Sequence, residues 1–403
     1  MGKHSHHLLF DDEPEIQKIN NLKINSMKRL LFYPLYIAFF AACGNTNNTS
    51  EAPKAELHLA ISREIDLGPL KLEIVPLETT KEALLAGVNH AHIDKENDRI
   101  FVLSSFNVYI FDGKGRFVAK LNRGRGPDEV LQLTSFSVNP NKKIVCVLDM
   151  GKYLKFYDYS GNFLRNIELE TFFSMDLHFA DDKHLYLVSN YVGGQEDYFV
   201  SKYNFEEKKI TEKLIHVSNS AYVRSTNLLV PNSFTYNDGN LVFFSPSIFA
   251  LFEQRDSSMI KVVDLDLGSM LPPLNMANDL ILENRSLFAE EIKKRGYVPQ
   301  LLYAHAFKGF YFIGLDDKDR SCYVINKTKH NEVYSNGPLH NYLGLPEVES
   351  LSFPVGNQDD AIVLACNPSD FFNDLNEGSK IIQLGDTILK INASDNPILI
   401  SVY

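Results

Sequence analysis

The sequence predicts an all-β protein, a six-bladed β-propeller whose last blade is closed by strands from the two ends of the chain. Three observations predict it: an apolar strand recurs six times, the copies share flanking strands, and the last copy lacks parts that the two chain ends can supply. The composition agrees, because 12% aromatic residues, 22 glycines and 17 prolines favour many short strands separated by turns.

The repeated strand is a mostly apolar run that ends in small or polar residues. Its copies begin 44, 41, 56, 69 and 52 residues apart. This spacing fits a propeller blade, a four-stranded unit of ~40–45 residues, enlarged in places by insertions. The copies are RIFVLSS (99–105), KIVCVLD (143–149), HLYLVSN (184–190), NLVFFSP (240–246), GFYFIGL (309–315) and AIVLACN (361–367).

The flanking segments complete a four-stranded antiparallel sheet around the copies. After the first five copies come a third strand, a turn such as 112–115 and a fourth strand such as 117–121. A strand with small or polar residues is also expected before every copy, at 88–94, 133–139, 175–180, 233–237, 303–307 and 350–354.

The sixth copy has no such tail, and the two ends of the chain supply one. The chain ends in the strand 398–403, while 70–77 is an orphan strand ahead of the first blade. Pairing these two strands in one sheet closes the ring and leaves no blade with an open edge.

The N-terminal part reads as an export signal that ends at a cysteine. Residues 27–29 are a basic start, and the apolar run 30–42 is interrupted by Pro34 and is shorter than the ~20 residues that span a bilayer. Phe40-Ala41-Ala42-Cys43 resembles a bacterial lipobox, with Phe40 in place of the usual Leu, which implies that Cys43 is lipidated. A transmembrane anchor and an unprocessed signal are the alternatives.

We therefore divide the chain into an upstream extension with a lipoprotein signal peptide (1–42), a flexible tether (43–56) and the propeller (57–403). Met27 is the expected natural start of translation. The insertion at about 268–300 contains a helical pattern at 280–295, with apolar residues spaced for a short amphipathic helix.

Several of these features together resemble one known family. The export signal with Cys43, the blade pattern, the GRGPDE turn (124–129) and the ending Asp395-Asn396-Pro397-Ile398-Leu399 are similar to the six-bladed β-propeller lipoproteins of Bacteroidota, over residues 57–403. The resemblance implies an envelope lipoprotein of the outer membrane, in a family whose biochemical role is largely unassigned. Residues 44–48 lack the acidic side chains frequent after the lipidated cysteine in surface-exported members, which favours a periplasm-facing protein.

The turn between the first two blades is the first candidate ligand site. Pro127 removes a backbone N–H and a strand-like run follows, so the turn is a connector and not a phosphate loop. It lies on the face that carries the longest insertions, where binding sites usually gather. Arg123, Arg125, Asp128 and Glu129 could bind a carboxylate or sugar hydroxyls; alternatively, the glycines serve the backbone and the charges pair between blades.

The channel is the second candidate, as a metal site. The strand register predicts one ring of polar side chains from His92, Ser137, His178, Thr235 and Ser352, and a second from His90, Ser135 and Asp176. His90, His92, Asp176 and His178 could ligate a divalent metal. Blade five supplies a ligand only if its register shifts by one residue to His305. A polar, wet channel without metal is the alternative.

The sequence favours binding over catalysis. It has no G-x-S-x-G or H-E-x-x-H motif, so no catalytic residue is assigned. The net charge of −11 argues against nucleic acid. Cys146, Cys322 and Cys366 are expected as small buried residues. We expect a membrane-anchored binding or scaffolding protein without a cofactor, whose partner is a peptide, a glycan or an envelope protein. The alternative is a metal-dependent hydrolase or lactonase in the channel.

Overall fold

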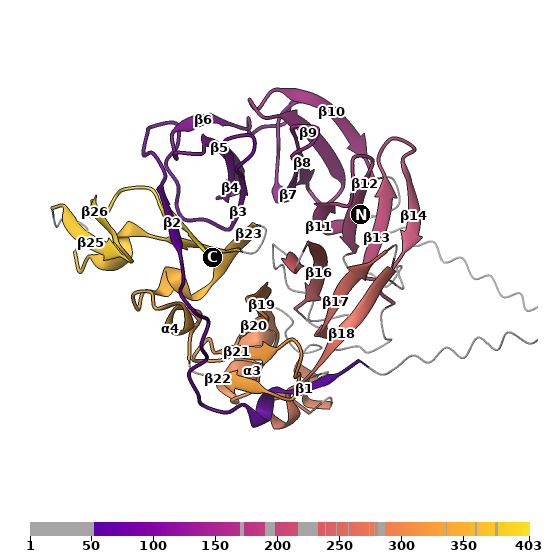
Figure 1. The fold of residues 1–403 in the computed structure, drawn as a ribbon. Helices are drawn as coiled ribbons and strands as arrows, with labels where there is room; N and C mark the ends of the chain where they lie inside the picture. The colour runs from indigo at the N-terminus through magenta and orange to yellow at the C-terminus, as the bar shows by residue number, and fades with distance from the viewer. Residues whose placement is uncertain are drawn as a thin grey trace, which may run out of the picture. The chain divides into compact units, whose positions relative to one another are not determined.

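Residues 52–403 form six sheets arranged in a ring, the architecture of a six-bladed β-propeller (Figure 1). The structure is a computed structural model, and it describes residues 52–169, 173–189, 198–216, 233–237, 239–246, 248–256, 258–273, 275–277, 279–280, 287–335, 337–358, 361–374 and 378–403. The predicted signal peptide, Cys43 and most of the tether lie outside these residues. So do residues 191–197 and 218–231, two further long segments between strands.

The first three blades follow the four-strand pattern that the repeats predict. Each is an antiparallel sheet in sequence order. Blade 1 contains β3 (His90–Asp94), β4 (Arg99–Ser104), β5 (Asn107–Asp112) and β6 (Phe117–Lys120). Blade 2 contains β7 (Leu133–Asn139), β8 (Ile144–Asp149), β9 (Tyr153–Asp158) and β10 (Phe163–Glu168). Blade 3 contains β11 (Ser174–Phe179), β12 (His184–Ser189), β13 (Val200–Asn204) and β14 (Lys209–Lys213).

Blades 4 and 5 keep the pattern. Blade 4 contains β15 (Phe234–Asn237), β16 (Asn240–Ser245), β17 (Ile248–Arg255) and β18 (Ser258–Asp266). Blade 5 contains β19 (Leu301–Phe307), β20 (Phe310–Leu315), β21 (Cys322–Asn326) and β22 (Val333–Ser335). All six repeated runs of the sequence are therefore the second strands of blades.

Blade 6 is closed by both ends of the chain, as predicted. Its order is β23 (Pro354–Gln358), β24 (Ala361–Cys366), β27 (Ile398–Val402) and β2 (Leu72–Pro76). Strand β2 pairs antiparallel with β27, from Leu72 opposite Val402 to Pro76 opposite Ile398. The N-terminal strand thus lies outermost in the blade that the C-terminal strand completes.

The first strand of blade 6 begins later than the sequence predicts. Residues 349–352 form a 3-10 helix, and β23 starts at Pro354, a residue type that sheets accept as the first residue of a strand. Ser352 is buried beside His340, with its Oγ 3.5 Å from His340 Nδ1. The predicted place of Ser352 in the channel ring is therefore wrong, and Gly356 takes it.

The N-terminal segment follows the outer edges of blades 4 and 5 before it reaches blade 6 (Figure 1). Residues Lys54–Glu56, the end of the predicted tether, form β1, which pairs parallel with β18 as a fifth strand of blade 4. Ile61 then bridges Tyr334 of β22 in blade 5. This segment, 52–76, is called the strap below. It covers edges that would otherwise expose unpaired backbone groups.

Short helices and one additional hairpin fill the insertions. Helix α3 (Phe288–Lys294) lies within the predicted helical pattern, and α4 (Leu339–Leu343) follows blade 5. The hairpin of β25 (Lys380–Leu384) and β26 (Thr387–Ile391) follows β24 and precedes β27 in the sequence, and it forms a separate two-stranded sheet. No helix among the described residues is long and apolar enough to cross a lipid bilayer.

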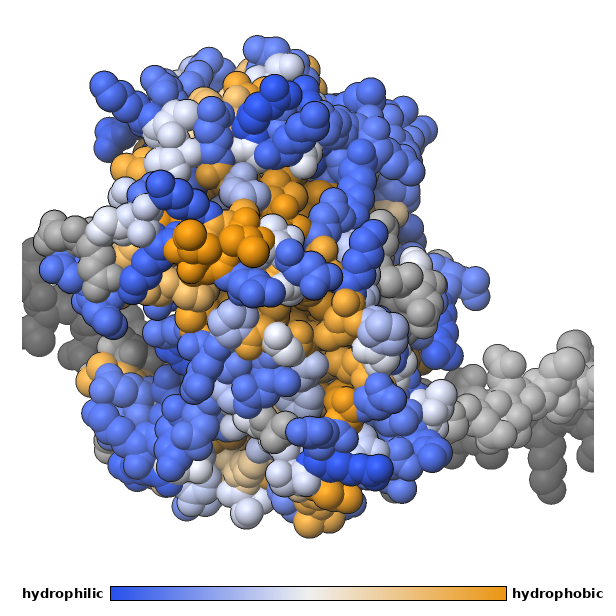
Figure 2. Space-filling model, turned by 60° about the vertical axis from the view of Figure 1, so that its left-hand side comes forward, coloured by the Kyte–Doolittle hydropathy of each residue, from blue (hydrophilic) through white to orange (hydrophobic). Residues whose placement is uncertain are grey.

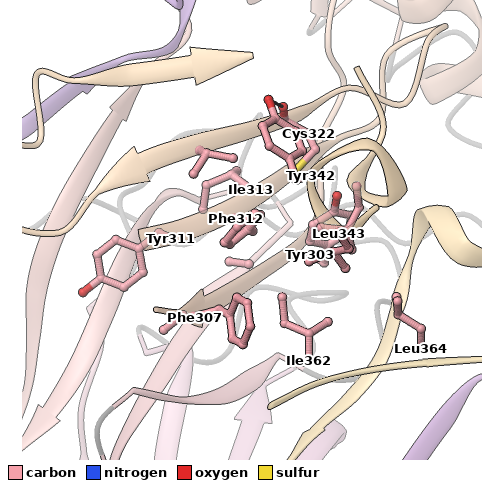
Figure 3. Packing of buried hydrophobic residues seen from close by; sticks show 14 of the residues in the cluster. Tyr303, Phe307, Tyr311, Phe312, Ile313, Cys322, Tyr342, Leu343, Ile362 and Leu364 are labelled. Carbon is pink, nitrogen blue, oxygen red and sulfur yellow. Dashed lines mark hydrogen bonds between the residues drawn. The ribbon is translucent and has the colours of Figure 1, made fainter. Parts of the chain in front are cut away.

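The hydrophobic core lies between neighbouring blades. Separate clusters join blades 6 and 1, 1 and 2, 2 and 3, and 3 and 4, and the largest joins blades 4, 5 and 6. Figure 3 shows part of the largest cluster, where Phe307 and Phe312 of blade 5 lie near Ile362 of blade 6. Cys146, Cys322 and Cys366 are buried free thiols, as expected. Each central strand has neighbours on both faces, which explains why it reads as a continuous apolar run.

The innermost strands share one register around the channel. In each blade, one residue of the innermost strand lies opposite the third residue of the second strand. These residues are His92, Ser137, His178, Thr235, His305 and Gly356. The first four were predicted, and blade 5 supplies His305. Gly356 leaves room for blade 1, because a Cβ there would lie 2.1 Å from the Ala91 carbonyl oxygen.

Candidate ligand-binding site

A cavity of about 540 Å³ opens among blades 1, 2, 3 and 6, at the end of the channel where their first strands begin. It lies on the face formed by the blade-to-blade links and the turns between second and third strands, where the sequence places the long insertions. Small-molecule sites have ~300–1,000 Å³. Its lining comprises Ala86, Gly87, Val88, Asn89, Leu103, Ser104, Ser105, Phe106, Gln132, Leu133, Thr134, Met175 and Asn367.

The described lining of the cavity mixes apolar side chains with uncharged polar ones. Among the described residues that line the cavity, none has an ionisable side chain. Gln132 and Asn367 contribute side-chain amides, and these make no hydrogen bond to the part of the chain that the structure describes. Ser105 adds an exposed hydroxyl. The cavity therefore combines apolar contact surface with neutral donors and acceptors.

Phe106 lies at the rim on a strained turn. Ser105 and Phe106 are the two residues between β4 and β5, where Ser104 pairs with Asn107, and their φ angles are +47° and +63°. Two-residue hairpin turns with two positive φ angles favour Asn and Gly, because a bulky side chain there costs about 1–2 kcal/mol. The Phe106 side chain is nevertheless 55% exposed, so burial does not offset that cost.

Further exposed apolar side chains lie on the blade-to-blade links and the turns between second and third strands that form this face. Leu131, Met150 and Phe173 are 37%, 41% and 49% exposed. Backbone hydrogen bonds hold their segments together: Met150 N donates to Gln132 O at 2.8 Å, and Ser174 N donates to Gly151 O at 2.8 Å. Exposed apolar side chains on the face that holds a cavity are typical of a binding surface.

The blade-connecting loop 122–130 borders this face and is held by its own backbone. Val130 N donates to Asn122 O at 2.9 Å, and Gly124 N donates to Val130 O at 3.1 Å. The Glu129 carboxylate folds back and accepts from Gly126 N at 2.7 Å. A Cβ at Gly124 would lie 2.0 Å from that carboxylate, which explains the glycine.

Blade 2 holds the same loop through a buried ion pair. Lys155 Nζ lies 3.0 Å from Asp149 Oδ2 and also donates to the Glu129 backbone oxygen, while both side chains are more than nine-tenths buried. Asp149 Oδ1 accepts from Gln132 N at 2.7 Å. Tyr157 donates its hydroxyl to Asp128 O at 3.0 Å. These contacts position the loop and the adjacent cavity wall.

The loop charges that the sequence singles out have different surroundings. Arg123, Arg125 and Asp128 are exposed, and Glu129 is half-buried. No ion pair between described residues includes any of the four, so the expected pairing between blades is not seen here. None of them lines the cavity. Ligand binding by these side chains stays a prediction.

The predicted channel residues come together in a narrow pocket, deeper along the same strands. His90, His92, Asp176 and His178 all line it, with Phe136 and Phe234 among its apolar walls. His90 lies with its ring 4.5 Å from that of Phe136, and His178 Nε2 lies 2.7 Å from the Tyr236 hydroxyl.

The three imidazoles are neutral at pH 7. Enclosure by the protein lowers the pKa of His90 and His178 to about 3 and that of His92 to about 4, because little water remains to solvate the cation. Neighbouring imidazoles lower the pKa of His90 and His178 further. The buried Nδ1 of His90 has no hydrogen-bond partner among the described residues.

Asp176 joins three blades. It accepts hydrogen bonds from the Ser135 hydroxyl of blade 2, from Leu177 N at 2.9 Å and from Ser233 N, just ahead of β15, at 2.9 Å. Burial raises the pKa of its carboxyl, an effect that the hydrogen bonds oppose. The carboxylate is thus engaged in linking blades.

Within the described ranges, one group of three potential metal ligands has its ligand atoms within 4.8 Å of one another, and it lies outside this pocket. It consists of Glu56, His58 and Asp266, and Lys54 Nζ already lies 2.6 Å from Asp266 Oδ2. Metal binding by the channel histidines, and the hydrolase or lactonase activity that depends on it, stay predictions.

The comparisons with known proteins place the chain in a family. Residues 70–403 match the domain of unknown function DUF4934. The chain belongs to this family. Among solved structures, a "putative exported protein" from Bacteroides fragilis has a TM-score of 0.65 at 19% identity, covering 87% of this chain and 98% of its own. The WD40 domain of Neurospora crassa Pan2 has a TM-score of only 0.36 at 8% identity, covering 78% and 74%. No curated protein matches the sequence.

These findings confirm the expected family resemblance and the six-bladed fold of this DUF4934 protein. The cavity itself was not predicted. The feature of the sequence that could have indicated it is the segment Ser-Ser-Phe-Asn at 104–107. It places a bulky phenylalanine in a hairpin turn where glycine is favoured.

Proposed function

We propose that this DUF4934 protein is an exported binding protein, held to the envelope by a lipid on Cys43, whose uncharged ligand occupies the channel-mouth cavity. The observation that carries the binding proposal is the open cavity of about 540 Å³ with neutral polar groups and an exposed aromatic side chain at its rim. Pockets of this size, mostly apolar with a few polar groups, are the usual form of small-ligand sites.

Export and lipidation have separate support. The Bacteroides fragilis relative is described as a "putative exported protein", and this chain has an apolar run that ends at Cys43 in a lipobox-like context. A tether between the lipid and the strap would hold the propeller away from the membrane. The face with the cavity would then remain accessible to a ligand. The periplasmic side of the outer membrane is the proposed location.

The binding proposal is tested with a library of uncharged small-molecule fragments, observed by ligand-detected NMR. We expect some fragments to bind the wild-type protein. Their affinity for the Phe106→Ala variant should be at least tenfold lower. Leu164→Ala is the matched control, because Leu164 is 51% exposed on the outer strand β10 and should not affect binding. If no fragment binding depends on Phe106, the proposal is wrong.

The anchor is tested by Cys43→Ala in cells, followed by membrane fractionation. We expect the variant to move into the soluble fraction, since removal of the thiol removes the site of acylation. Incorporation of a labelled fatty acid should disappear in parallel. Membrane association that persists in the variant contradicts lipid anchoring while leaving the cavity proposal intact.

A further inference from the structure

We propose that the ligand of the cavity is a neutral oligosaccharide, with one sugar ring stacked on Phe106. This inference rests on the binding function proposed above and names its ligand class. It depends on three properties of the cavity: the lack of charge, the kind of polar groups and the way in which Phe106 is presented.

The lack of charge selects a neutral ligand. Among the described lining residues there is no lysine, arginine, histidine or carboxylate. An anionic or cationic ligand would lose its hydration there without gaining an opposite charge. The nearby arginines do not change this, because Arg123 and Arg125 lie outside the lining, on the loop ahead of Gln132.

The polar groups of the cavity match hydroxyls. The Gln132 and Asn367 amides offer donors and acceptors together, and neither is engaged with another described residue. The exposed Ser105 hydroxyl adds a group of the same kind. Hydroxyls also both donate and accept, so a ligand rich in hydroxyls satisfies such groups without charged partners.

Phe106 is presented at the rim by a short, well-defined turn. It is held by a two-residue turn between β4 and β5, whose neighbouring residues Leu103, Ser104 and Val108 are buried. The backbone of the turn is therefore held in place, and it presents the ring at the rim. A sugar ring has an apolar face of C–H groups and an edge of hydroxyls, and this matches an aromatic face surrounded by amides and a hydroxyl.

The test uses the absence of tryptophan from the chain. Phe106→Trp places a single indole at the rim, and its emission is followed while maltohexaose, cellohexaose or chitohexaose is added. We expect a saturable change with at least one of these neutral oligosaccharides. Leu164→Trp, with its indole on the outer strand of blade 2, should give no change.

A second variant separates binding from folding. Phe106→Gly suits the φ of +63° better than phenylalanine does, so this variant should fold at least as stably as the wild type. We expect calorimetry to show at least tenfold weaker binding of the same oligosaccharide. Undiminished affinity in Phe106→Gly overturns the stacking role of Phe106.

Charge provides the remaining test. An oligogalacturonate of matched length should bind at least tenfold more weakly than the best neutral oligosaccharide, and equal or tighter binding overturns the inference. If no oligosaccharide binds while neutral fragments still bind in a Phe106-dependent way, the saccharide inference fails and the binding function stands. If neither binds, both fail.

Discussion

Asn396 is a buried amide that joins the two ends of the ring. Its Nδ2 donates to Glu78 O at 2.7 Å and to Ala83 O at 2.6 Å, and its Oδ1 accepts from Leu85 N at 2.8 Å. The side chain is 2% exposed. It therefore connects the segment ahead of β27 with the link from blade 6 to blade 1, and this gives a physical reason for the Asp-Asn-Pro sequence near the C-terminus.

Asn396→Ala should lower the free energy of unfolding by about 3 kcal/mol, because it leaves the buried Leu85 N–H without its acceptor and removes the hydrogen bonds to the Ala83 and Glu78 carbonyl oxygens. Urea denaturation followed by circular dichroism measures the loss. The control is Asn392→Ala in the exposed turn nearby, which should change the stability by less than about 0.5 kcal/mol. Equal effects of the two substitutions would contradict the linking role of Asn396.

At the level of single residues, the channel ring could be predicted because strand pairing places equivalent positions opposite equivalent positions. His92, Ser137, His178 and Thr235 were found by counting from the second strands. The same counting gave the wrong residue, Ser352, in blade 6. A 3-10 helix precedes β23 there, and the strand begins only at Pro354. A local helix of four residues leaves no periodic signal to detect.

Among the elements, the loop between β6 and β7 fastens blade 1 to blade 2, and we call this loop, residues 122–130, the latch. The sequence shows its glycines, and the structure adds that Lys155, Asp149 and Tyr157 hold its backbone from blade 2. These three side chains are distant in sequence from the glycines and share no motif with them, so the sequence alone could not indicate their partnership with the loop.

Lys155→Met should destabilise the protein by about 3 kcal/mol, because it leaves the Asp149 carboxylate buried without its cation. Since the loop loses one of its attachments, trypsin should also cleave faster after Arg123 and Arg125. Urea denaturation and a timed digestion analysed by mass spectrometry measure the two effects.

The matched control is Lys152→Met. Lys152 lies 2.5 Å from Glu168 in an exposed pair, with side chains 43% and 49% accessible, and such pairs contribute at most about 1 kcal/mol. We expect little loss of stability and an unchanged cleavage rate. A Lys155→Met protein that behaves like this control would show that the latch does not depend on the buried pair.

The hairpin formed by β25 and β26 was not predicted. Its alternating pattern fits a strand pair, but it has no place in the four-strand blade from which the other elements were recognised. Ile381 and Ile388 are 75% and 69% exposed on it. Figure 2 brings this side of the molecule forward and shows hydrophobic residues gathered among hydrophilic ones.

For the whole molecule, the blade number and the closure could be predicted from the sequence. Each central strand is covered on both sides by neighbouring blades, which gives six similar apolar runs at blade-like spacing. The cavity could not be predicted, because its wall comes from four blades and becomes a surface only when the ring closes. The propeller thus shows its fold in repeats and assembles its candidate site from segments that do not repeat.

The course of the strap has a mechanical consequence. Before the chain reaches the closing strand β2, it has already paired with β18 of blade 4 and bridged β22 of blade 5. Tension applied to the chain ahead of Ala52 is therefore resisted first by these two attachments. The seam between β2 and β27 bears load only after they yield, so a propeller pulled from its N-terminal end keeps its ring shut.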